Sequence, residues 1–267
     1  SNNSSKQELS VDILVICAAA AATSCLTFFS GFGLGTLLMP VFLLFFPLET
    51  AIALTAVVHF LNNVLKFFLM AKEIHWKVAL SFGLPAFLAA FAGARALFKL
   101  EEFDPVFVYT LMGKEFHVLP AKLVIAAVMV LFLILETLPL FKKVSFSPKV
   151  LPAGGVVSGF FGGLSGHQGA LRTMFLLKCG LSKEAFIATG VVIAFFVDVS
   201  RLSVYWGRLA GSNYQDYAAV MAAAVASAFA GILIGKRLLK KMTLAVVERV
   251  IAVMLFVIAV LLGAGVI

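Results

Sequence analysis

Long apolar runs, separated by short polar or glycine-rich links, make up most of this chain. A helix that spans a membrane needs roughly 20 predominantly apolar residues, and several of the runs reach that length. Lipid offers the backbone no hydrogen-bond partners, so such runs are expected to be helical. The pattern predicts helical segments, in chain order, at residues 11–30, 36–46, 48–71, 77–97, 121–141, 152–164, 170–177, 183–206, 217–239 and 244–267.

Glycine-rich sequence interrupts the apolar pattern at two places. The stretch from Ser30 to Gly35 reads SGFGLG, and the stretch from Ser165 to Arg172 reads SGHQGALR. Irregular backbone at membrane depth is tolerated only where it is buried in protein or lines a water-filled cavity. Around the second break, the apolar pieces form either one broken helix or a re-entrant hairpin, and the sequence leaves both arrangements open.

The two halves of the chain look like copies of one unit. An offset of 134 positions pairs Gly35 with Gly169, and a second offset of 142 pairs Gly93 with Gly235. We therefore predict an all-α polytopic membrane protein with two homologous halves of about four helices each and a glycine-broken or re-entrant helix in each half. Parallel and inverted repeats both remain open. The predicted divisions are a disordered N-terminus at 1–10, a first membrane repeat at 11–141, a basic linker at 142–149 and a second membrane repeat at 150–267.

Composition supports the membrane assignment. Hydrophobic residues make up 62% of the 267 residues and charged residues 13%, with a mean hydropathy of +1.08. A soluble domain carries about 25% charged residues. The net charge of +8 is spread over the links between apolar runs, which gives nucleic-acid binding little support. Residues 99–119 form a polar linker, and its apolar patch at 106–112 is expected along the membrane interface.

The glycine breaks are the first candidates for a binding site. A helix that begins just after such a break exposes free backbone N–H groups and the positive end of its dipole, which together favour an anion. The competing interpretation is that the glycines only allow close helix packing. The candidate substrate-binding residues at the two breaks are Gly33, Gly35, Ser165, Gly166, His167, Gln168 and Gly169.

Basic and amide side chains within apolar segments extend this candidate site. Arg172 has no acidic residue close in sequence, which suits a site that awaits an anionic group able to accept its bidentate fork. Arg201 lies three residues after Asp198, so the two form either a structural ion pair or part of the substrate site. Asn62 and Asn63 are candidates for substrate contact and equally for packing between helices.

Asp198 and His59 are the best candidates for a proton relay, although no sequence spacing links them. Ionisable residues inside a membrane are expensive and usually functional. A lone histidine on a helix, however, is more often a satisfied core residue. Both interpretations of His59 stay open at this point.

The sequence contains no enzyme signature. It has no HExxH, no Gly-x-Ser-x-Gly and no P-loop, so we expect no catalytic activity, no metal and no cofactor. Three cysteines, Cys17, Cys25 and Cys179, lack the spacing of a redox or metal motif. Cys17 and Cys25 lie eight residues apart on one predicted helix, roughly 12 Å along its axis, so they cannot bridge directly.

The duplicated glycine-rich segments resemble those of the sulfite exporter TauE/SafE family, also described as sulfur-anion and sulfonate permeases. The resemblance covers about residues 11–267 and is carried by Gly31 to Gly35 with Pro40, by Gly159 to Gly169, and by the helix ends at Gly93 and Gly235. The sequence departs from the family pattern at His167 and Gln168, where a more glycine-rich run is usual, and at Met174, which replaces the proline. These departures bear on which anion is carried.

The resemblance implies a secondary transporter that exports sulfite, a sulfonate or a similar small anion across a bacterial inner membrane by alternating access. Its expected partners are that anion and the lipid bilayer, with an oligomer possible. Two other classes remain open from the residues alone. One is a membrane thiol-redox or maturation protein, which needs Cys179 to meet another cysteine, and the other is an anion channel.

Overall fold

The fold is a bundle of apolar helices, as the sequence predicts. The computed structural model describes residues 13–25, 34–142, 144–209, 215–238 and 244–267. Within these residues, five helices are long and apolar enough to cross a membrane, and the helix Ile13–Cys25 and the segment Ala252–Gly263 of the last helix are shorter apolar stretches. The prediction of an all-α polytopic membrane protein is confirmed.

The described elements are divided between the two predicted halves of the chain. The first half contains Ile13–Cys25, α2 (Leu34–Leu43), α3 (Leu48–Met70), the 3-10 turn Ala71–Glu73, α4 (Trp76–Glu101), β1 (Phe107–Leu111), β2 (Lys114–Val118), α5 (Pro120–Thr137) and α6 (Pro139–Lys142). The second half contains the 3-10 turn Pro148–Val150, α7 (Leu151–Ser165), α8 (Gly169–Leu176), α9 (Lys183–Leu209), α10 (Gln215–Leu238) and α11 (Leu244–Gly263). Common ancestry of the halves, and the division at 142–149, stay predictions.

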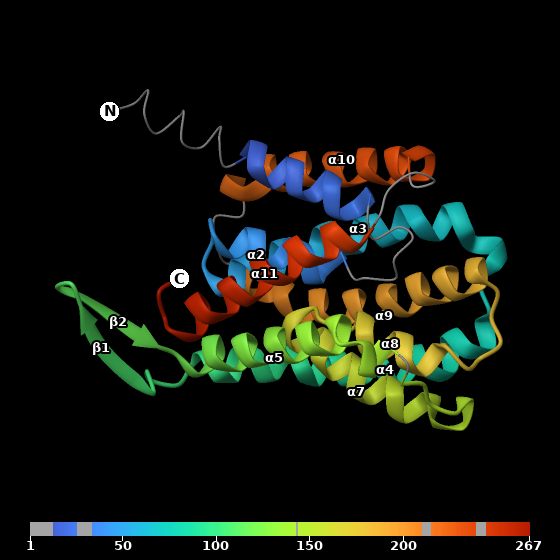
Figure 1. Cartoon of the computed structure of the whole chain (residues 1–267), viewed down its shortest axis with the longest axis horizontal. Coiled ribbons are helices and arrows are strands. Elements are labelled where there is room, and N and C mark those ends of the chain that lie inside the picture. The colour runs from blue at the N-terminus through green and yellow to red at the C-terminus, as the bar shows by residue number, and fades with distance from the viewer. Residues whose placement is uncertain (1–12, 26–33, 143, 210–214, 239–243) are drawn as a thin grey trace.

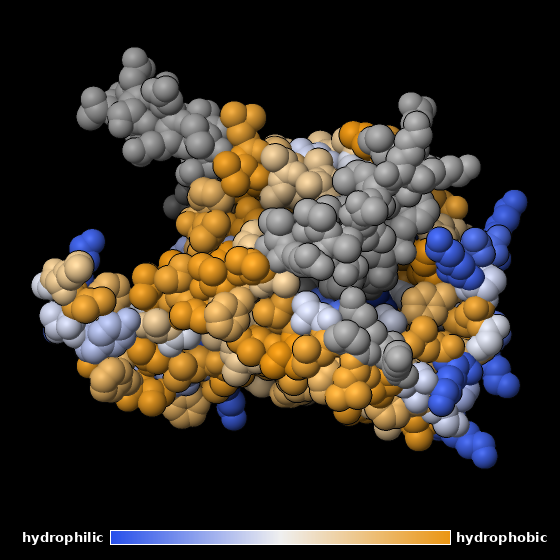
Figure 2. All heavy atoms as spheres, viewed as in Figure 1, coloured by the Kyte–Doolittle hydropathy of each residue, from blue (hydrophilic) through white to orange (hydrophobic). Residues whose placement is uncertain are grey.

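The helices run roughly along the long axis of the molecule, and the β1–β2 hairpin projects beyond one end (Figure 1). Outside the grey residues, hydrophobic side chains cover most of the visible face, while many hydrophilic ones gather toward the two ends of the long axis (Figure 2). This distribution matches an apolar layer between two aqueous phases, because a charged group in hydrocarbon costs several kcal/mol. We therefore expect the bundle to cross the membrane along its long axis.

The linker between α4 and α5 differs from the prediction. Residues 99–119 contain a two-stranded antiparallel hairpin, in which Phe107 pairs with Val118 and Leu111 with Lys114. Met112 and Gly113 form its turn, both with positive φ, at 51° and 78°. Such a turn matches the twist of the flanking strands. The signal in the sequence was the Met-Gly pair between two short runs rich in β-branched and aromatic residues.

Helix α5 is shorter than predicted. It ends at Thr137 rather than continuing to residue 141, and Leu138 takes an extended conformation. The residue before a proline is disfavoured in the helical region, so Pro139 stops α5 and begins the short α6.

The chain turns back at the second glycine break, which decides between the two arrangements left open by the sequence. Phe175 near the end of α8 lies against Gly154 in the first turn of α7, where an added Cβ would meet the Phe175 ring. The Phe175 ring also stacks on Phe146, and the Phe146 N–H donates to the Met174 carbonyl. Helices α7 and α8 therefore form a re-entrant hairpin whose tip is the turn at residues 165–168.

Helix α7 packs on α4 through a stripe of glycines. The most extensive contact between any two described elements is that of α4 with α7. Gly155, Gly159 and Gly163 lie four residues apart, and a Cβ at each would overlap the carbonyl oxygen of Phe82, Ala86 or Ala90, respectively. Small residues at this spacing let two backbones approach closely in a membrane. This contact fixes the depth of the hairpin tip.

Adding one methyl group to this stripe is expected to destabilise the bundle. Gly163→Ala puts a Cβ onto a backbone atom of Ala90, which cannot move aside like a side chain. Overpacking of this kind costs about 1–3 kcal/mol. Thermal unfolding in detergent should show a lower midpoint than for Gly263→Ala, whose Cβ would meet only the Ala126 side chain, at 3.2 Å. Equal midpoints for the two variants would contradict a backbone-to-backbone contact.

Candidate functional site

Polar side chains gather at the centre of the bundle, between α3 and α9. His59 is the middle residue of α3, eleven positions after Leu48 and eleven before Met70. Its Nδ1 lies 2.6 Å from Oδ2 of Asp198 on α9, and Asn63 donates to the same oxygen at 3.0 Å. All three side chains are buried. The structure thus brings together His59 and Asp198, which are 139 residues apart in the chain.

Arg201 completes the coordination of this carboxylate. Its Nε and Nη2 donate to Oδ1 of Asp198 at 3.0 and 2.8 Å, one turn along α9. Arg201 is only 1% exposed and is the largest fully buried side chain in the described part of the chain. Its remaining nitrogen, Nη1, has no hydrogen-bond partner among the described residues. A buried guanidinium with an unused donor is costly, so this nitrogen points to a ligand.

The free nitrogen of Arg201 lies against the tip of the re-entrant hairpin. Gly166 caps α7 in the left-handed conformation, with φ of 81°, and an ideal Cβ there would lie 2.6 Å from Arg201 Nη1. The next residues, His167 and Gln168, are buried, and neither His167 Nε2 nor either amide atom of Gln168 has a partner among the described residues. Ser165 instead donates to the Phe161 carbonyl within α7. The tip therefore carries several unsatisfied polar atoms beside Arg201.

Arg172 faces the same interior rather than the lipid headgroups. It is half-buried in α8, and an added Cβ at Gly190 on α9 would lie 3.4 Å from its Nε. Arg172 is close enough to interact electrostatically with Asp198 and with Lys66, a buried lysine on α3. The sequence signal that Lys66 belongs here is a lysine within the apolar run at 48–71, four positions after Asn62.

We call this group the central polar cluster, and it consists of His59, Asn63, Lys66, Arg172, Asp198 and Arg201. It contains two arginines, Arg172 and Arg201, and one carboxylate, that of Asp198, which forms an ion pair with Arg201. The two arginines give the cluster more positive than negative charge, and such a surplus in a low-dielectric interior attracts a small anion and repels a cation.

Some predicted residues do not join the cluster. Gly33 lies outside the described residues, and Gly35 lies in the first turn of α2. Asn62 is fully buried, and its Oδ1 accepts from Ser24 of the helix Ile13–Cys25 at 2.7 Å, which favours a packing role for that oxygen. Helix α8 begins at Gly169, one residue before the predicted start at 170, and Gln168 precedes it without a side-chain cap.

Two supporting residues were missed in the sequence. Tyr205 lies one turn after Arg201, and its hydroxyl donates to the Gly163 carbonyl at 2.7 Å, which ties α9 to the last turn of α7. Ser158 donates to the Gln168 carbonyl at 3.2 Å and closes the hairpin tip onto α7. Tyrosine and serine are common in membrane helices, so neither stands out without the three-dimensional contact.

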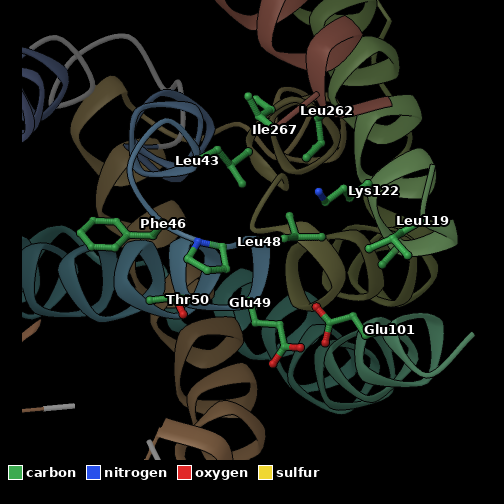
Figure 3. Close-up of a pocket in the computed structure, with 12 residues that line it drawn as sticks. Leu43, Phe46, Leu48, Glu49, Thr50, Glu101, Leu119, Lys122, Leu262 and Ile267 are labelled. Atoms are coloured by element: carbon green, nitrogen blue, oxygen red, sulfur yellow. The ribbon is translucent and has the colours of Figure 1, made fainter. Parts of the chain in front are cut away.

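A separate cavity of about 470 Å³ lies at the end of the bundle, between α2, α3, α5 and the C-terminal end of α11. Figure 3 shows the carboxylates of Glu49 and Glu101 at its edge and Lys122 on the opposite side. Two carboxylates make this cavity a poor binding site for an anion. Among the described residues, no group of three His, Cys, Asp or Glu side chains is placed to hold a metal ion.

Comparison with known protein families gives a match over most of the chain. The family model described as "Sulfite exporter TauE/SafE" matches residues 15–262, which is nearly the whole chain. A search of curated proteins and a search of solved structures found no significant match.

Proposed function

The chain belongs to the sulfite exporter TauE/SafE family, and we propose that it moves sulfite or a closely related sulfur anion through the central polar cluster. Membership makes it a multi-pass membrane protein of a transporter family for sulfite or related anions. Our proposal adds the site, the alternating-access mechanism, export as the direction, and the bacterial cytoplasmic membrane as the location.

The observation that carries the proposal is the unused nitrogen of Arg201. Nη1 is buried beside Gly166 at the hairpin tip, in a region with surplus positive charge. A small oxyanion bound there would accept a hydrogen bond from this nitrogen. That bond would replace one that the anion makes with water in solution. The backbone N–H groups that open α8 at Gly169 lie at the same tip and add the positive end of a helix dipole.

The position of the cluster supports the proposed alternating access. Side chains from α3 in the first half and from α8 and α9 in the second form it, so the bound anion would touch both halves. Transporters with broken helices commonly hold their substrate at such a meeting of halves, near the middle of the membrane. Rocking of one half against the other would open the cluster to each side in turn.

The membrane potential is sufficient to drive export. A potential of 100 mV, negative inside, contributes about 2.3 kcal/mol for each negative charge that leaves the cell. Export of a sulfur anion therefore needs no coupled ion. Export in this direction does not require Asp198 and His59 to relay protons. Their role would be to balance part of the positive charge of the cluster and to orient its side chains.

The proposal is tested by the flux of radiolabelled sulfite in proteoliposomes that contain the purified chain. Arg172→Ala is expected to lower the flux at least tenfold, because it removes one of the cluster's basic groups. One hydrogen bond to a charged group is worth about 1.5–3 kcal/mol, and about 1.4 kcal/mol corresponds to a tenfold change. Arg95→Ala removes an exposed arginine that lies 4.2 Å over the Phe91 ring, and should leave the flux within about twofold. No sulfite flux in the unmodified protein would overturn the proposal.

A thiol-redox protein would need its cysteines for function, whereas the proposed anion transport does not. Cys17, Cys25 and Cys179 are all free thiols in the structure. The triple variant with serine at these three positions is expected to keep its sulfite flux within about twofold, since none of them belongs to the cluster. Loss of flux in a variant that still purifies as a folded protein would favour the redox class instead.

A further inference from the structure

Two hydrogen-bond acceptors at the hairpin tip are buried without a donor. His167 is fully buried and Gln168 is 3% exposed, and the unpartnered atoms include His167 Nε2 and Gln168 Oε1. Both amide atoms of Gln168 lack partners, so an acceptor is left over whichever way the amide is turned. Buried polar atoms normally find a partner, and an unsatisfied one destabilises the protein. These acceptors therefore indicate which hydrogen-bonding groups a ligand of this site carries.

The neighbours of His167 fix Nε2 as an acceptor. Nδ1 lies 3.2 Å from the Ser165 carbonyl oxygen, which can only accept, so Nδ1 carries the hydrogen. Nδ1 also lies 3.1 Å from Ser165 Oγ, whose own hydrogen is donated to the Phe161 carbonyl. Both contacts require the same tautomer. In the neutral ring, the lone pair of Nε2 is then left without a donor.

Donors and acceptors thus occur together at one turn of the chain. Arg201 Nη1 lies beside Gly166, the residue before His167, and Gln168 packs its Cβ and Cδ toward Gly162. A fully deprotonated oxyanion offers only acceptor oxygens. It would satisfy Arg201 but leave the lone pairs of His167 and Gln168 unpaired. A ligand that satisfies the whole turn has an anionic face and a hydrogen of its own to donate.

We propose, on the basis of the function proposed above, that the site takes a sulfur oxyanion that bears a hydrogen-bond donor. For sulfite this is the protonated monoanion, hydrogensulfite, rather than the dianion. The anionic oxygens accept from Arg201, and the ligand's O–H donates to His167 Nε2 or Gln168 Oε1. Each exported sulfur therefore carries one proton with it as part of the substrate.

The charge of the site does not distinguish the monoanion from the dianion. Arg172 and Arg201 together carry more charge than the single carboxylate of Asp198, and this surplus attracts a monoanion and a dianion alike. Hydrogen bonding is more selective. A site built to hydrogen-bond a particular group rejects an analogue that lacks it, because its own polar groups are then left unpaired. The acceptors, and not the cations, distinguish the monoanion from the dianion.

Two anions of nearly equal shape test the proposal on the unmodified protein. Sulfamate and methanesulfonate are both monoanions across the neutral range, and they differ in an NH₂ group against a CH₃ group. Sulfamate is expected to bind the detergent-purified chain about tenfold to a hundredfold more tightly in calorimetry, because only it can donate. Equal affinity, or tighter binding of methanesulfonate, overturns the proposal.

The pH dependence of flux supplies a second measurement. At fixed total sulfite, flux should rise as the pH falls and the monoanion replaces the dianion. The site also holds ionisable side chains of its own, namely His59, Lys66, His167, Arg172, Asp198 and Arg201, so flux is expressed relative to that of sulfamate, whose charge does not change. A ratio that is flat, or that rises with the dianion, contradicts the proposal even if sulfite is transported.

A variant assigns the effect to the turn. Gln168→Met removes the amide acceptor at similar length and should reduce the preference for sulfamate over methanesulfonate by about tenfold. If this variant does not fold, the selectivity of the unmodified chain still decides the question. Absence of sulfite flux, with sulfamate still bound preferentially, would overturn the proposed transport function but support the ligand class.

Discussion

Replacement of Arg201 by glutamine is expected to lower sulfite flux about a hundredfold. The variant loses the buried Nη1 donor beside Gly166 and the fork that holds Asp198. Hydrogen bonds to charged groups are worth about 1.5–3 kcal/mol each, and every 1.4 kcal/mol is about tenfold. Flux of radiolabelled sulfite in proteoliposomes measures the loss.

Folding has to be separated from transport in this experiment. Removal of one partner of a buried ion pair costs about 3–5 kcal/mol, so Arg201→Gln also lowers stability. Arg201→Lys keeps a positive charge next to Asp198 but lacks the second arm that reaches Gly166. We expect this variant to fold and to lose at least tenfold in flux. Full flux in Arg201→Lys would show that the free nitrogen does not touch the substrate.

A methyl group at Gly166 is expected to remove most transport. Gly166→Ala places its Cβ about where Arg201 Nη1 now lies, since the ideal position is 2.6 Å from that nitrogen. The position also has φ of 81°, which costs a non-glycine residue roughly 1–2 kcal/mol. The displaced guanidinium can no longer present Nη1 to the substrate. We expect flux to fall at least tenfold.

Gly180 provides a matched control for backbone strain. It also has a positive φ, 66°, but nothing lies within 4 Å of an added Cβ. Gly180→Ala should therefore lose similar stability in a thermal unfolding measurement and keep its flux within about twofold. If both variants lose transport equally, strain in the chain, and not the contact with Arg201, explains the effect of Gly166→Ala.

The re-entrant hairpin illustrates what the sequence left undecided. The glycine break at Gly166 and the shortness of the apolar pieces around it were visible, and both were consistent with a broken helix that continues across the membrane. Phe175 of α8 packs on Gly154 of α7, which lies 21 residues earlier in the chain. This contact shows that the chain turns back after the break. Local sequence does not encode the direction of the chain after a turn, because that direction depends on which surfaces pack together.

The linker between α4 and α5 shows a different limit. Its hairpin pairs residues close in sequence, and the Met112–Gly113 turn was a signal that could have been used. The apolar side chains at 106–112 indicate a patch for the membrane interface, which stays a prediction and does not by itself reveal a strand. In a chain this hydrophobic, a short amphipathic strand is easily hidden among apolar segments of other kinds.

Hydrophobic length alone determined that this chain crosses a membrane as helices, because lipid leaves the backbone no other way to satisfy its hydrogen bonds. The buried charges at Arg172, Asp198 and Arg201 likewise marked where function was to be sought. Only the tertiary structure joined His59 to Asp198 and aimed the free nitrogen of Arg201 at Gly166. Those contacts link residues far apart in sequence, and the packing of α3, α7 and α9, rather than any local propensity, brings them within reach.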